Sequence, residues 1–262
     1  MDLGLNRLPV LVMASSSGIG SGIALEFAHE GAIPILFARR EEKLVEVQNN
    51  IEKETGIKAR IYVGDITNLA DIENLFELIK AEYGSLFALV NNTGGPAAGG
   101  FDKFNDDDWQ KAFELTLLSY IRTIRCAVPL MCKLGSGRIV NNTSSSTKII
   151  LDNLLLSNTF RMGIVGLSKT LASELGPDNI LVNVIGPGKI ATDHVDYLDS
   201  LRAKKQNLPL DEYREKVFAG IPFGRYGETA EIARMVVFLC SKANTYVSGQ
   251  NILVDGALVK AY

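Results

Sequence analysis

The chain has 262 residues, of which 47% are apolar and 22% are charged, and its formal net charge is -3. This length fits one large α/β domain or two small ones and is ample for a substantial core, and the composition is typical of a soluble globular protein. The weak negative charge argues against nucleic acid or an anionic membrane as a partner. The three cysteines, Cys126, Cys132 and Cys240, form no CxxC pair, which predicts buried thiols in a reducing, cytoplasmic setting.

The N-terminal stretch carries an apolar run, "LPVLVMA", that is too short to span a membrane and lacks a basic leader. We therefore expect neither a signal peptide nor an anchor. Repeats, low-complexity tracts and Pro/Ser linkers are absent from the sequence, which predicts a single domain over 1–262.

Short apolar runs predict seven strands, most of them continuously hydrophobic, as expected for strands that are covered on both faces. They are "PVLVMA" (9–14), "PILFA" (34–38), "ARIYV" (59–63), "LFALV" (86–90), "GRIVNNT" (137–143), "NILVNVI" (179–185) and "NILV" (251–254). Proline lacks an N–H group, so we expect Pro34 to occupy the first position of its strand.

Amphipathic segments separate these runs and predict helices. In 69–83, for example, one apolar stripe consists of Leu69, Ile72, Leu75, Phe76 and Ile79. The alternation of strand and helix predicts a Rossmann-type, doubly wound α/β fold, with a seven-stranded parallel sheet and helices on both faces. In such folds, ligands bind at the carboxyl ends of the strands.

A glycine-rich loop, "MASSSGIGSGIA" (13–24), follows the first predicted strand and opens a helix. Gly18 and Gly20 allow the backbone to approach a pyrophosphate, and the helix N-terminus offers free N–H groups. The alternative is a glycine-rich turn without a ligand. The position between strand and helix favours dinucleotide binding.

This loop resembles the TGxxxGIG motif of the short-chain dehydrogenase/reductase family. Gly18, Ile19 and Gly20 match the motif, whereas Met13 and Ala14 occupy the places of its threonine and first glycine. An alanine is acceptable at that turn only if the backbone keeps φ negative.

The resemblance extends over nearly the whole chain. "GDIT" (64–67) is similar to the family's adenine-contacting segment, "NNTGG" (91–95) to its NNAG motif, and "GPGKIAT" (186–192) to the segment beside the nicotinamide. "GRYGETAEIARMVVFL" and "YVSGQNILVDG" match its last helix and strand. The resemblance implies cofactor contacts from Ala14, Ser16, Ser17, Gly18, Ile19, Gly20, Arg39, Arg40, Asp65, Ile66, Asn91, Thr93, Gly94, Arg161, Pro187, Gly188, Ile190 and Thr192.

The end of the second predicted strand, "FARREEKL", indicates which cofactor is preferred. Ala38 occupies the place where dinucleotide folds commonly hold an acidic residue on the ribose, and Arg39 and Arg40 follow. A guanidinium can bind a 2′-phosphate with two hydrogen bonds. NADP(H) is therefore favoured, and NAD(H) stays possible. Alternatively, the arginines are solvated or pair with Glu41 and Glu42.

The family's usual catalytic residues are asparagine, serine, tyrosine and lysine. Alignment by neighbouring motifs places Thr116, Ser144, Ser157 and Arg161 at these positions, so only the serine survives. None of the eight tyrosines in the chain is followed by a lysine four residues later, so no shift of register restores the motif.

Residues 157 and 161 are four positions apart, so both lie on one face of a helix. Arg161 supplies a permanent positive charge but does not release a proton at neutral pH, and a serine hydroxyl is a far weaker acid than a phenol. We expect Ser144, Ser157 and Arg161 to be the catalytic residues, acting by hydrogen bonding and charge on a developing alkoxide. The alternatives are a catalytically inactive dinucleotide-binding sensor or subunit, or a lyase- or isomerase-like reaction.

Other side chains near this position are weaker candidates. Lys148, Asp152, Asn153 and His194 are possible substitutes for the missing acid. The serines at 144–146 predict a polar turn rather than a hydrolase nucleophile, because no His–Asp pair accompanies them. The sequence indicates no metal site.

Residues 193–224 are polar and are flanked by proline and glycine, and the resemblance implies a substrate lid there. It also implies that helices around 105–133 and 154–176 form the contacts of a homo-tetramer. Among the branches of the family, the chain looks most like the 3-oxoacyl-[acyl-carrier-protein] reductases. The expected activity is interconversion of a carbonyl and an alcohol on a small-molecule or acyl substrate.

Overall fold

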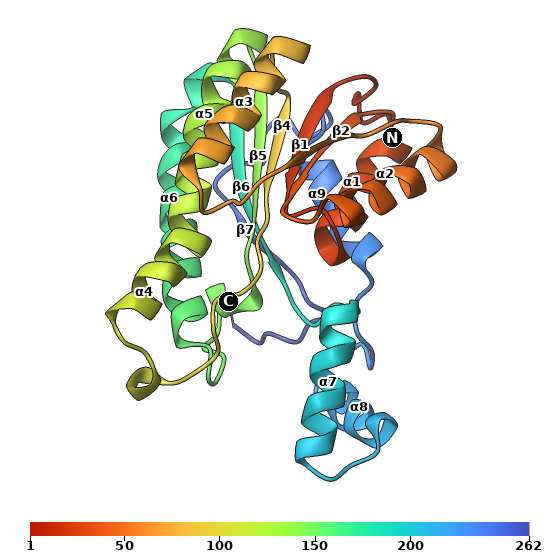
Figure 1. Cartoon of the computed structure of the whole chain (residues 1–262), viewed down its shortest axis with the longest axis vertical. Helices are drawn as coiled ribbons and strands as arrows, with labels where there is room; N and C mark the ends of the chain where they lie inside the picture. The colour runs from red at the N-terminus through yellow and green to blue at the C-terminus, as the bar shows by residue number, and fades with distance from the viewer. Residues whose placement is uncertain (262) are drawn as a thin grey trace.

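Seven parallel strands form one sheet in the computed structural model, which describes residues 1–261 apart from the side chain of His194. The strand order is β3-β2-β1-β4-β5-β6-β7 (Figure 1). The order reverses between β1 and β4, which confirms the predicted doubly wound fold. The strands are β1 Pro9–Met13, β2 Ile33–Ala38, β3 Arg60–Val63, β4 Ala88–Asn91, β5 Gly137–Asn142, β6 Ile180–Pro187 and β7 Asn251–Val254.

The central strands carry apolar side chains on both faces because helices cover both. Every residue of β1, β4 and β5 is buried. Each of the seven predicted runs overlaps a strand, with ends that shift by a residue or two. The register pairs Asn91 with Asn141, so the polar ends of β4 and β5 meet at the carboxyl edge of the sheet.

The expectation for Pro34 was wrong, because it is the second residue of β2 rather than the first. The N–H of Ile33 donates to the carbonyl of Leu8, the residue before β1. Since neighbouring residues of a strand point their N–H groups to opposite sides, Pro34 faces β3. Pairing with β3 begins only at Ile35, so no ladder hydrogen bond is lost at the proline.

Two helical layers enclose the sheet (Figure 1). One contains α1 Gly18–His29, α2 Glu41–Thr55 and α9 Thr229–Leu239, and the other contains α3 Leu69–Tyr83, α5 Ser119–Leu134 and α6 Leu155–Glu174. The predicted helix 69–83 is confirmed, and four of the five residues of its stripe are buried. Leu69 is the exception: it is 41% exposed, since it is the first residue of α3.

The helix before β5 is continuous from α4 Asp106–Phe113 through a π-helical turn, η2 Glu114–Leu118, into α5. By length and composition alone, Asp106–Leu134 is the one stretch in the described chain that could cross a membrane. It packs against α3, α6, β4 and β5, so it is a core helix of a soluble fold. Single-turn 3₁₀ segments occur at η1 Phe101–Lys103, η3 Ser145–Thr147 and η4 Gly176–Asp178.

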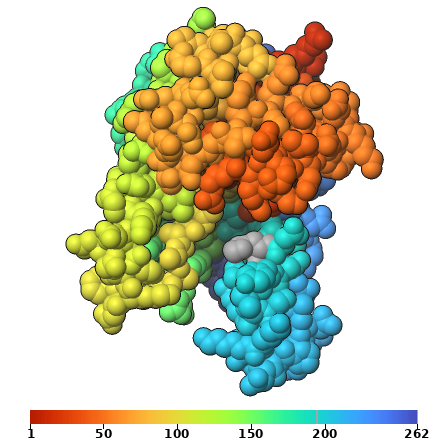
Figure 2. Space-filling view, in the orientation of Figure 1, coloured from red at the N-terminus to blue at the C-terminus, as the bar shows by residue number. Residues whose placement is uncertain are grey.

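Two helices, α7 Asp193–Lys205 and α8 Leu210–Ala219, project from the body of the molecule below the carboxyl edge of the sheet (Figure 1). Figure 2 shows the surface hollowed between this pair and the segment around α4. The carboxylate of Asp199 is 1% exposed, accepts a hydrogen bond from the Tyr226 hydroxyl at 2.7 Å and lies 3.7 Å from Nε of Arg214. These contacts fasten α7 to α8 and to the segment that leads into α9.

Candidate functional site

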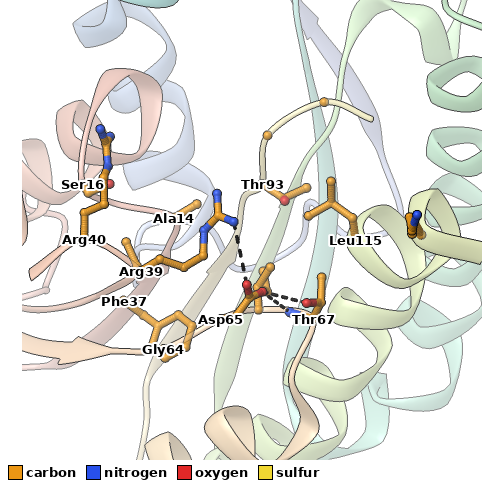
Figure 3. Close-up of a pocket in the computed structure, with 15 residues that line it drawn as sticks. Ala14, Ser16, Phe37, Arg39, Arg40, Gly64, Asp65, Thr67, Thr93 and Leu115 are labelled. Atoms are coloured by element: carbon orange, nitrogen blue, oxygen red, sulfur yellow. Dashed lines mark hydrogen bonds and ion pairs between the residues drawn. The ribbon is translucent and has the colours of Figure 1, made fainter. Parts of the chain in front are cut away.

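A cavity of about 470 Å³ lies at the carboxyl ends of β1, β2 and β4, where a doubly wound sheet binds its ligand (Figure 3). Among the predicted cofactor contacts, it is lined by Ala14, Ser16, Arg39, Arg40, Asp65, Ile66, Thr93 and Gly94. The remaining lining residues, which were not among the predicted cofactor contacts, are Phe37, Ala38, Gly64, Thr67, Gly95, Lys111 and Leu115. Lys111 and Leu115 are four residues apart, so one face of the α4–η2 helix forms a wall of the cavity.

The glycine-rich loop turns sharply at Ala14, and the structure does not meet the condition that an alanine there keeps φ negative. Ala14 has a φ of 48°, in the left-handed region that disfavours side chains. The strain is tolerated because neighbours fix the turn: the Asn92 side chain donates to the Ala14 carbonyl at 3.3 Å. Only glycine fits at position 20, because a Cβ there would lie 2.4 Å from the Ala14 carbonyl oxygen.

The N-terminus of α1 is open to a ligand. Ser17 precedes the helix in an extended conformation and its hydroxyl does not cap it, and the first turn carries no acidic side chain. The unused N–H groups and the positive end of the helix dipole thus remain available to an anion. A Cβ built on Gly18 would lie 3.4 Å from Cγ2 of Thr192, so the predicted segment 186–192 reaches the loop.

The two arginines after β2 point in different directions (Figure 3). Arg39 reaches across to Asp65, with 3.8 Å between Nη1 and Oδ2, so its described ionic partner is neither Glu41 nor Glu42. Burial favours the neutral form of Asp65, but hydrogen bonds from Thr67 and the Arg39 charge outweigh it and lower the pKa of Asp65. Arg40 makes no ion pair within the described chain, so its charge is free to meet a phosphate.

Ser157 and Arg161 lie in the first half of α6, on one face of the helix as their spacing predicts. Nε of Arg161 donates to Oγ of Ser157 at 3.1 Å, and the two residues are only 6–7% exposed. Burial lowers the pKa of Arg161, and the neighbouring Tyr120 hydroxyl partly offsets this effect. Because a guanidinium titrates far above neutral pH, Arg161 remains a cation.

Ser144 lies at the end of the loop that leaves β5 and begins the 3₁₀ turn η3. Its Oγ accepts a hydrogen bond from the N–H of Ser146 at 3.1 Å, so the hydroxyl proton is free for another acceptor. The η3 turn packs on α6, but no hydrogen bond joins Ser144 to Ser157 in the described structure. The structure therefore unites Ser157 with Arg161 and leaves Ser144 nearby on a separate element.

The position predicted for the family's asparagine is taken by Thr116, which lies in the π-helical turn. Thr116 is fully buried, and its Oγ1 has no hydrogen-bond partner among the described residues. π-helical turns often mark functional sites. One helical turn further on, Tyr120 is also fully buried, and its hydroxyl donates to the carbonyl of Asn142 at 2.7 Å. The sequence offered one signal for Tyr120: a polar hydroxyl in an apolar stretch of helix.

The Asn91 side chain faces the helical layer rather than the cavity. A chain of buried hydrogen bonds runs from Oγ1 of Thr123 to Asn91 (2.6 Å), from Asn91 to Asn141 (2.9 Å) and from Asn141 to Oγ of Ser168 (2.8 Å). We call these four residues the cross-sheet chain, because they link α5 to α6 through β4 and β5. Only the backbone of Asn91 is therefore free for a cofactor.

The segment 186–192 is held by its backbone. The N–H of Gly188 donates to Val254 at 3.0 Å, and a Cβ at Gly188 would lie 2.6 Å from that of Asp255. Ile190 is 4% exposed and belongs to the core, so its side chain is not available to a ligand. Thr192 accepts from the N–H of Val195 and caps α7. Pro187 is buried as the last residue of β6.

The weaker candidates for the missing acid lie outside the buried pair that Ser157 and Arg161 form. Lys148, Asp152 and Asn153 are solvent-exposed on the loop between η3 and α6. Asn153 adopts a left-handed conformation with a φ of 58°, and its carbonyl accepts the N–H of Gly99, which is a structural role. The side chain of His194 lies outside the described residues. Within the described residues, no cluster of His, Cys, Asp and Glu could hold a metal ion.

Comparison with known proteins identifies the family of this chain. The sequence model of a family described as enoyl-(acyl carrier protein) reductase matches residues 13–258, and curated reductases match almost the whole chain. The chain belongs to the short-chain dehydrogenase/reductase family. It is 30% identical over 258 residues to the NADPH-dependent reductase BacG of Bacillus subtilis, covering 98% of this chain and 100% of the relative.

Other members of the short-chain dehydrogenase/reductase family are similar to this chain in sequence and in structure over nearly its whole length. The 3-oxoacyl-[acyl-carrier-protein] reductase FabG of Thermotoga maritima is 33% identical over 251 residues, which cover 95% of this chain and 96% of the relative. The solved structure of L-sorbose reductase from Gluconobacter frateurii, complexed with NADPH and L-sorbose, superposes with a TM-score of 0.96 at 31% identity, covering 100% of both chains. NADPH is thus the cofactor named for relatives found by sequence and by structure.

Proposed function

We propose that this protein is an NADP(H)-dependent oxidoreductase that interconverts a carbonyl and an alcohol on a small-molecule or acyl substrate. In this proposal, hydroxyls and a guanidinium perform the work of the family's usual tyrosine and lysine. The observation that carries the proposal is the buried contact between Arg161 and Ser157, which aligns with the family's catalytic positions, in a chain with a cavity at the carboxyl ends of its central strands.

The residues present fit a dinucleotide. The open N-terminus of α1 suits the pyrophosphate, and Arg39 and Arg40 at the mouth of the cavity suit a 2′-phosphate. Asp65 and Ile66 would line the adenine, and the backbone of 91–94 and 187–192 would border the nicotinamide end. The bound cofactor supplies or accepts the hydride. These contacts support NADP(H) over NAD(H), as do the NADPH-named relatives.

The protein's own groups act on the substrate oxygen. Arg161 donates through Nε to the oxygen of Ser157, so the Ser157 proton is directed toward another acceptor, such as the carbonyl oxygen of a bound substrate. The hydroxyl proton of Ser144 is free in the same way. The positive charge of Arg161, in a poorly solvated position, stabilises negative charge that develops on that oxygen.

This arrangement polarises the substrate without a strong general acid. General acid–base catalysis contributes roughly 10²–10⁴-fold to typical enzymes, so we expect slower turnover than in relatives that hold the tyrosine. Positioning and electrostatic stabilisation remain, and they suffice for measurable hydride transfer.

A two-stage experiment tests the proposal. Quenching or enhancement of NADPH fluorescence first measures binding, with NADH as the comparison. Turnover is then followed by NADPH absorbance with a panel of ketones, aldehydes and sugars. We expect Ser157→Ala and Ser144→Ala each to reduce turnover, and Ser157→Tyr combined with Arg161→Lys to raise it. Turnover that is unchanged in both alanine variants would show that the site has been assigned wrongly.

A second candidate is a dinucleotide-binding protein without catalysis, acting as a sensor or subunit. It is favoured by the chemistry of the pair itself, since neither a serine hydroxyl nor a guanidinium exchanges protons readily near neutral pH. Tight NADPH binding with no turnover on any compound of the panel, in wild type and in the Tyr/Lys variant alike, would support this candidate. Absence of binding to both cofactors would exclude both candidates.

We also propose that 1–262 form a single domain, that 193–224 act as a substrate lid, and that the protein is a cytoplasmic homo-tetramer joined through α4–α5 and α6. Met162, on the outer side of α6, is 49% exposed, and Ile150 in the preceding loop is 84% exposed, which supports an apolar contact there. Light scattering after size exclusion should give four times the 28.5 kDa of the chain. Replacing Met162 with glutamate should reduce that mass.

A further inference from the structure

Two asparagine side chains join the end of β5 to the glycine-rich loop. Nδ2 of Asn142 donates to Oδ1 of Asn92 at 2.8 Å, and Nδ2 of Asn92 donates to the carbonyl of Ala14 at 3.3 Å. Asn142 is the last residue of β5, and Asn92 directly follows β4. We call Asn142 and Asn92 the amide relay, because they connect the centre of the sheet to the turn that begins the loop.

The chemistry of the Ala14 carbonyl dictates the direction of the amide relay. A carbonyl oxygen only accepts hydrogen bonds, so Asn92 must turn its NH₂ group toward Ala14 and its oxygen toward Asn142. Asn142 must then supply the NH₂ group of the second contact, as it does in the structure. An apolar side chain at position 142 would remove this donor, and the Asn92 amide would lose the contact that fixes its orientation.

Asparagine is an unfavourable residue for this place in the sheet. Asn142 is 4% exposed in a strand whose residues are all buried, and its own Oδ1 has no hydrogen-bond partner among residues 1–261. A buried acceptor without a donor destabilises a fold, and an apolar residue of similar shape would avoid that loss. The stability of β5 therefore does not account for Asn142, whereas its donation to Asn92 does.

The amide relay acts on a peptide group that is held from two sides. The N–H of Ser15 donates to the carbonyl of Phe37 in β2 at 3.2 Å. The carbonyl of Ala14 belongs to the same peptide group and accepts from Asn92, beside β4. The Asn92 amide also packs against Gly20, where a Cβ would lie 2.9 Å from its Nδ2. Together these contacts fix the peptide that follows Ala14, whose φ is 48°.

We propose that Asn142 is a positioning residue for the cofactor. By orienting Asn92, it holds Ala14 in the left-handed conformation that an alanine disfavours. The loop and the open N-terminus of α1 thereby keep the form that binds the pyrophosphate of NADP(H). The inference rests on the proposed function for the identity of the ligand, and on the hydrogen bonds alone for the relay.

Fluorescence titration of the full chain with NADPH tests the role in binding. Asn142→Leu should raise the Kd of NADPH about tenfold, because the relaxed turn must return to the strained conformation when the cofactor binds. Glycine adopts the left-handed conformation without steric strain. In an Ala14→Gly background, Asn142→Leu should therefore raise the Kd by less than about twofold. Equal losses of affinity in the two backgrounds would overturn the proposal.

The matched control is Asn141→Leu, which removes the neighbouring amide of β5. Asn141 bonds to Asn91 and Ser168 and takes no part in the amide relay. Any effect of Asn141→Leu on the Kd of NADPH should therefore be the same with and without Ala14→Gly. If Asn141→Leu depends on Ala14→Gly as strongly as Asn142→Leu does, the dependence is a general response to loss of a buried amide, and the proposal is wrong.

A measurement without cofactor separates this proposal from the proposed function. In wild type, Ala14→Gly should raise the guanidinium chloride midpoint of unfolding because it relieves the strained turn. In Asn142→Leu the turn is already relaxed, so Ala14→Gly should lower the midpoint through the conformational entropy of glycine. If neither NADPH nor NADH binds, the proposed function fails, and these two signs still decide the relay. Midpoints that move in the same direction in both backgrounds would overturn it.

A second variant covers the case in which Asn142→Leu does not fold. Asn92→Leu removes the donor to Ala14 from the other end of the amide relay. We expect the same weakening of NADPH binding and the same relief by Ala14→Gly. A loss of affinity that Ala14→Gly does not reduce would refute the relay from that end.

Discussion

Replacing Ala14 with glycine is a direct test of the strained turn in the cofactor loop. Ala14 has a φ of 48°, and a left-handed conformation costs an L-residue about 1–2 kcal/mol. Glycine removes this cost but loses about 0.5–1 kcal/mol more conformational entropy on folding than alanine does. Ala14 is only half-buried, so loss of its methyl group removes little packing. We therefore expect Ala14→Gly to raise the free energy of unfolding by about 0.5–1 kcal/mol.

The assay is equilibrium unfolding in guanidinium chloride, accompanied by a thermal melt in which the midpoint should rise by about 1–3 °C. The matched control is Ala81→Gly, an exposed alanine in α3, where the same change should lower the free energy of unfolding by about 0.5–1 kcal/mol. The two variants should thus differ in sign. If Ala14→Gly destabilises the protein as much as Ala81→Gly does, the loop does not hold residue 14 in the left-handed region.

Three further predictions concern charged groups. Arg39→Ala and Arg40→Ala should each weaken NADPH binding roughly fivefold to tenfold, with NADH binding unchanged, as measured by fluorescence titration. Because the folded state lowers the pKa of Asp65, its ionised form adds stability above the pKa of the unfolded chain, and that stability is lost as pH falls through the lower folded value. Urea unfolding of Asp65→Asn should match wild type at strongly acidic pH and fall below it at neutral pH. Tyr226→Phe should lower the free energy of unfolding by roughly 1–3 kcal/mol, because it leaves the buried carboxylate of Asp199 without its hydroxyl donor.

The sequence was sufficient for the fold because the deciding signals are local. Continuous apolar runs predicted all seven strands because the central strands are covered on both faces, and one apolar stripe with the helical period predicted the helix 69–83. Pro34 was misplaced because the position of a proline depends on which neighbour its missing N–H faces. That is a property of the sheet register rather than of the run itself.

The site was predictable only in part, because several of its features depend on contacts between residues that are far apart in the sequence. The contact between Ser157 and Arg161 follows from helical spacing, and the structure contains it. The φ of Ala14 depends on Asn92 and Gly20 packing against its carbonyl, and sequence spacing does not reveal such contacts. Tyr120 on α5 donates to the carbonyl of Asn142 at the end of β5, so only the tertiary structure brings these two residues together.

The cross-sheet chain of Thr123, Asn91, Asn141 and Ser168 holds together the two helices that flank the candidate site. It ties α5 to α6 through the centre of the sheet by buried amides and hydroxyls, and neither Ser157 nor Arg161 takes part in it. The link between the two helices therefore does not depend on which side chains stand at positions 157 and 161.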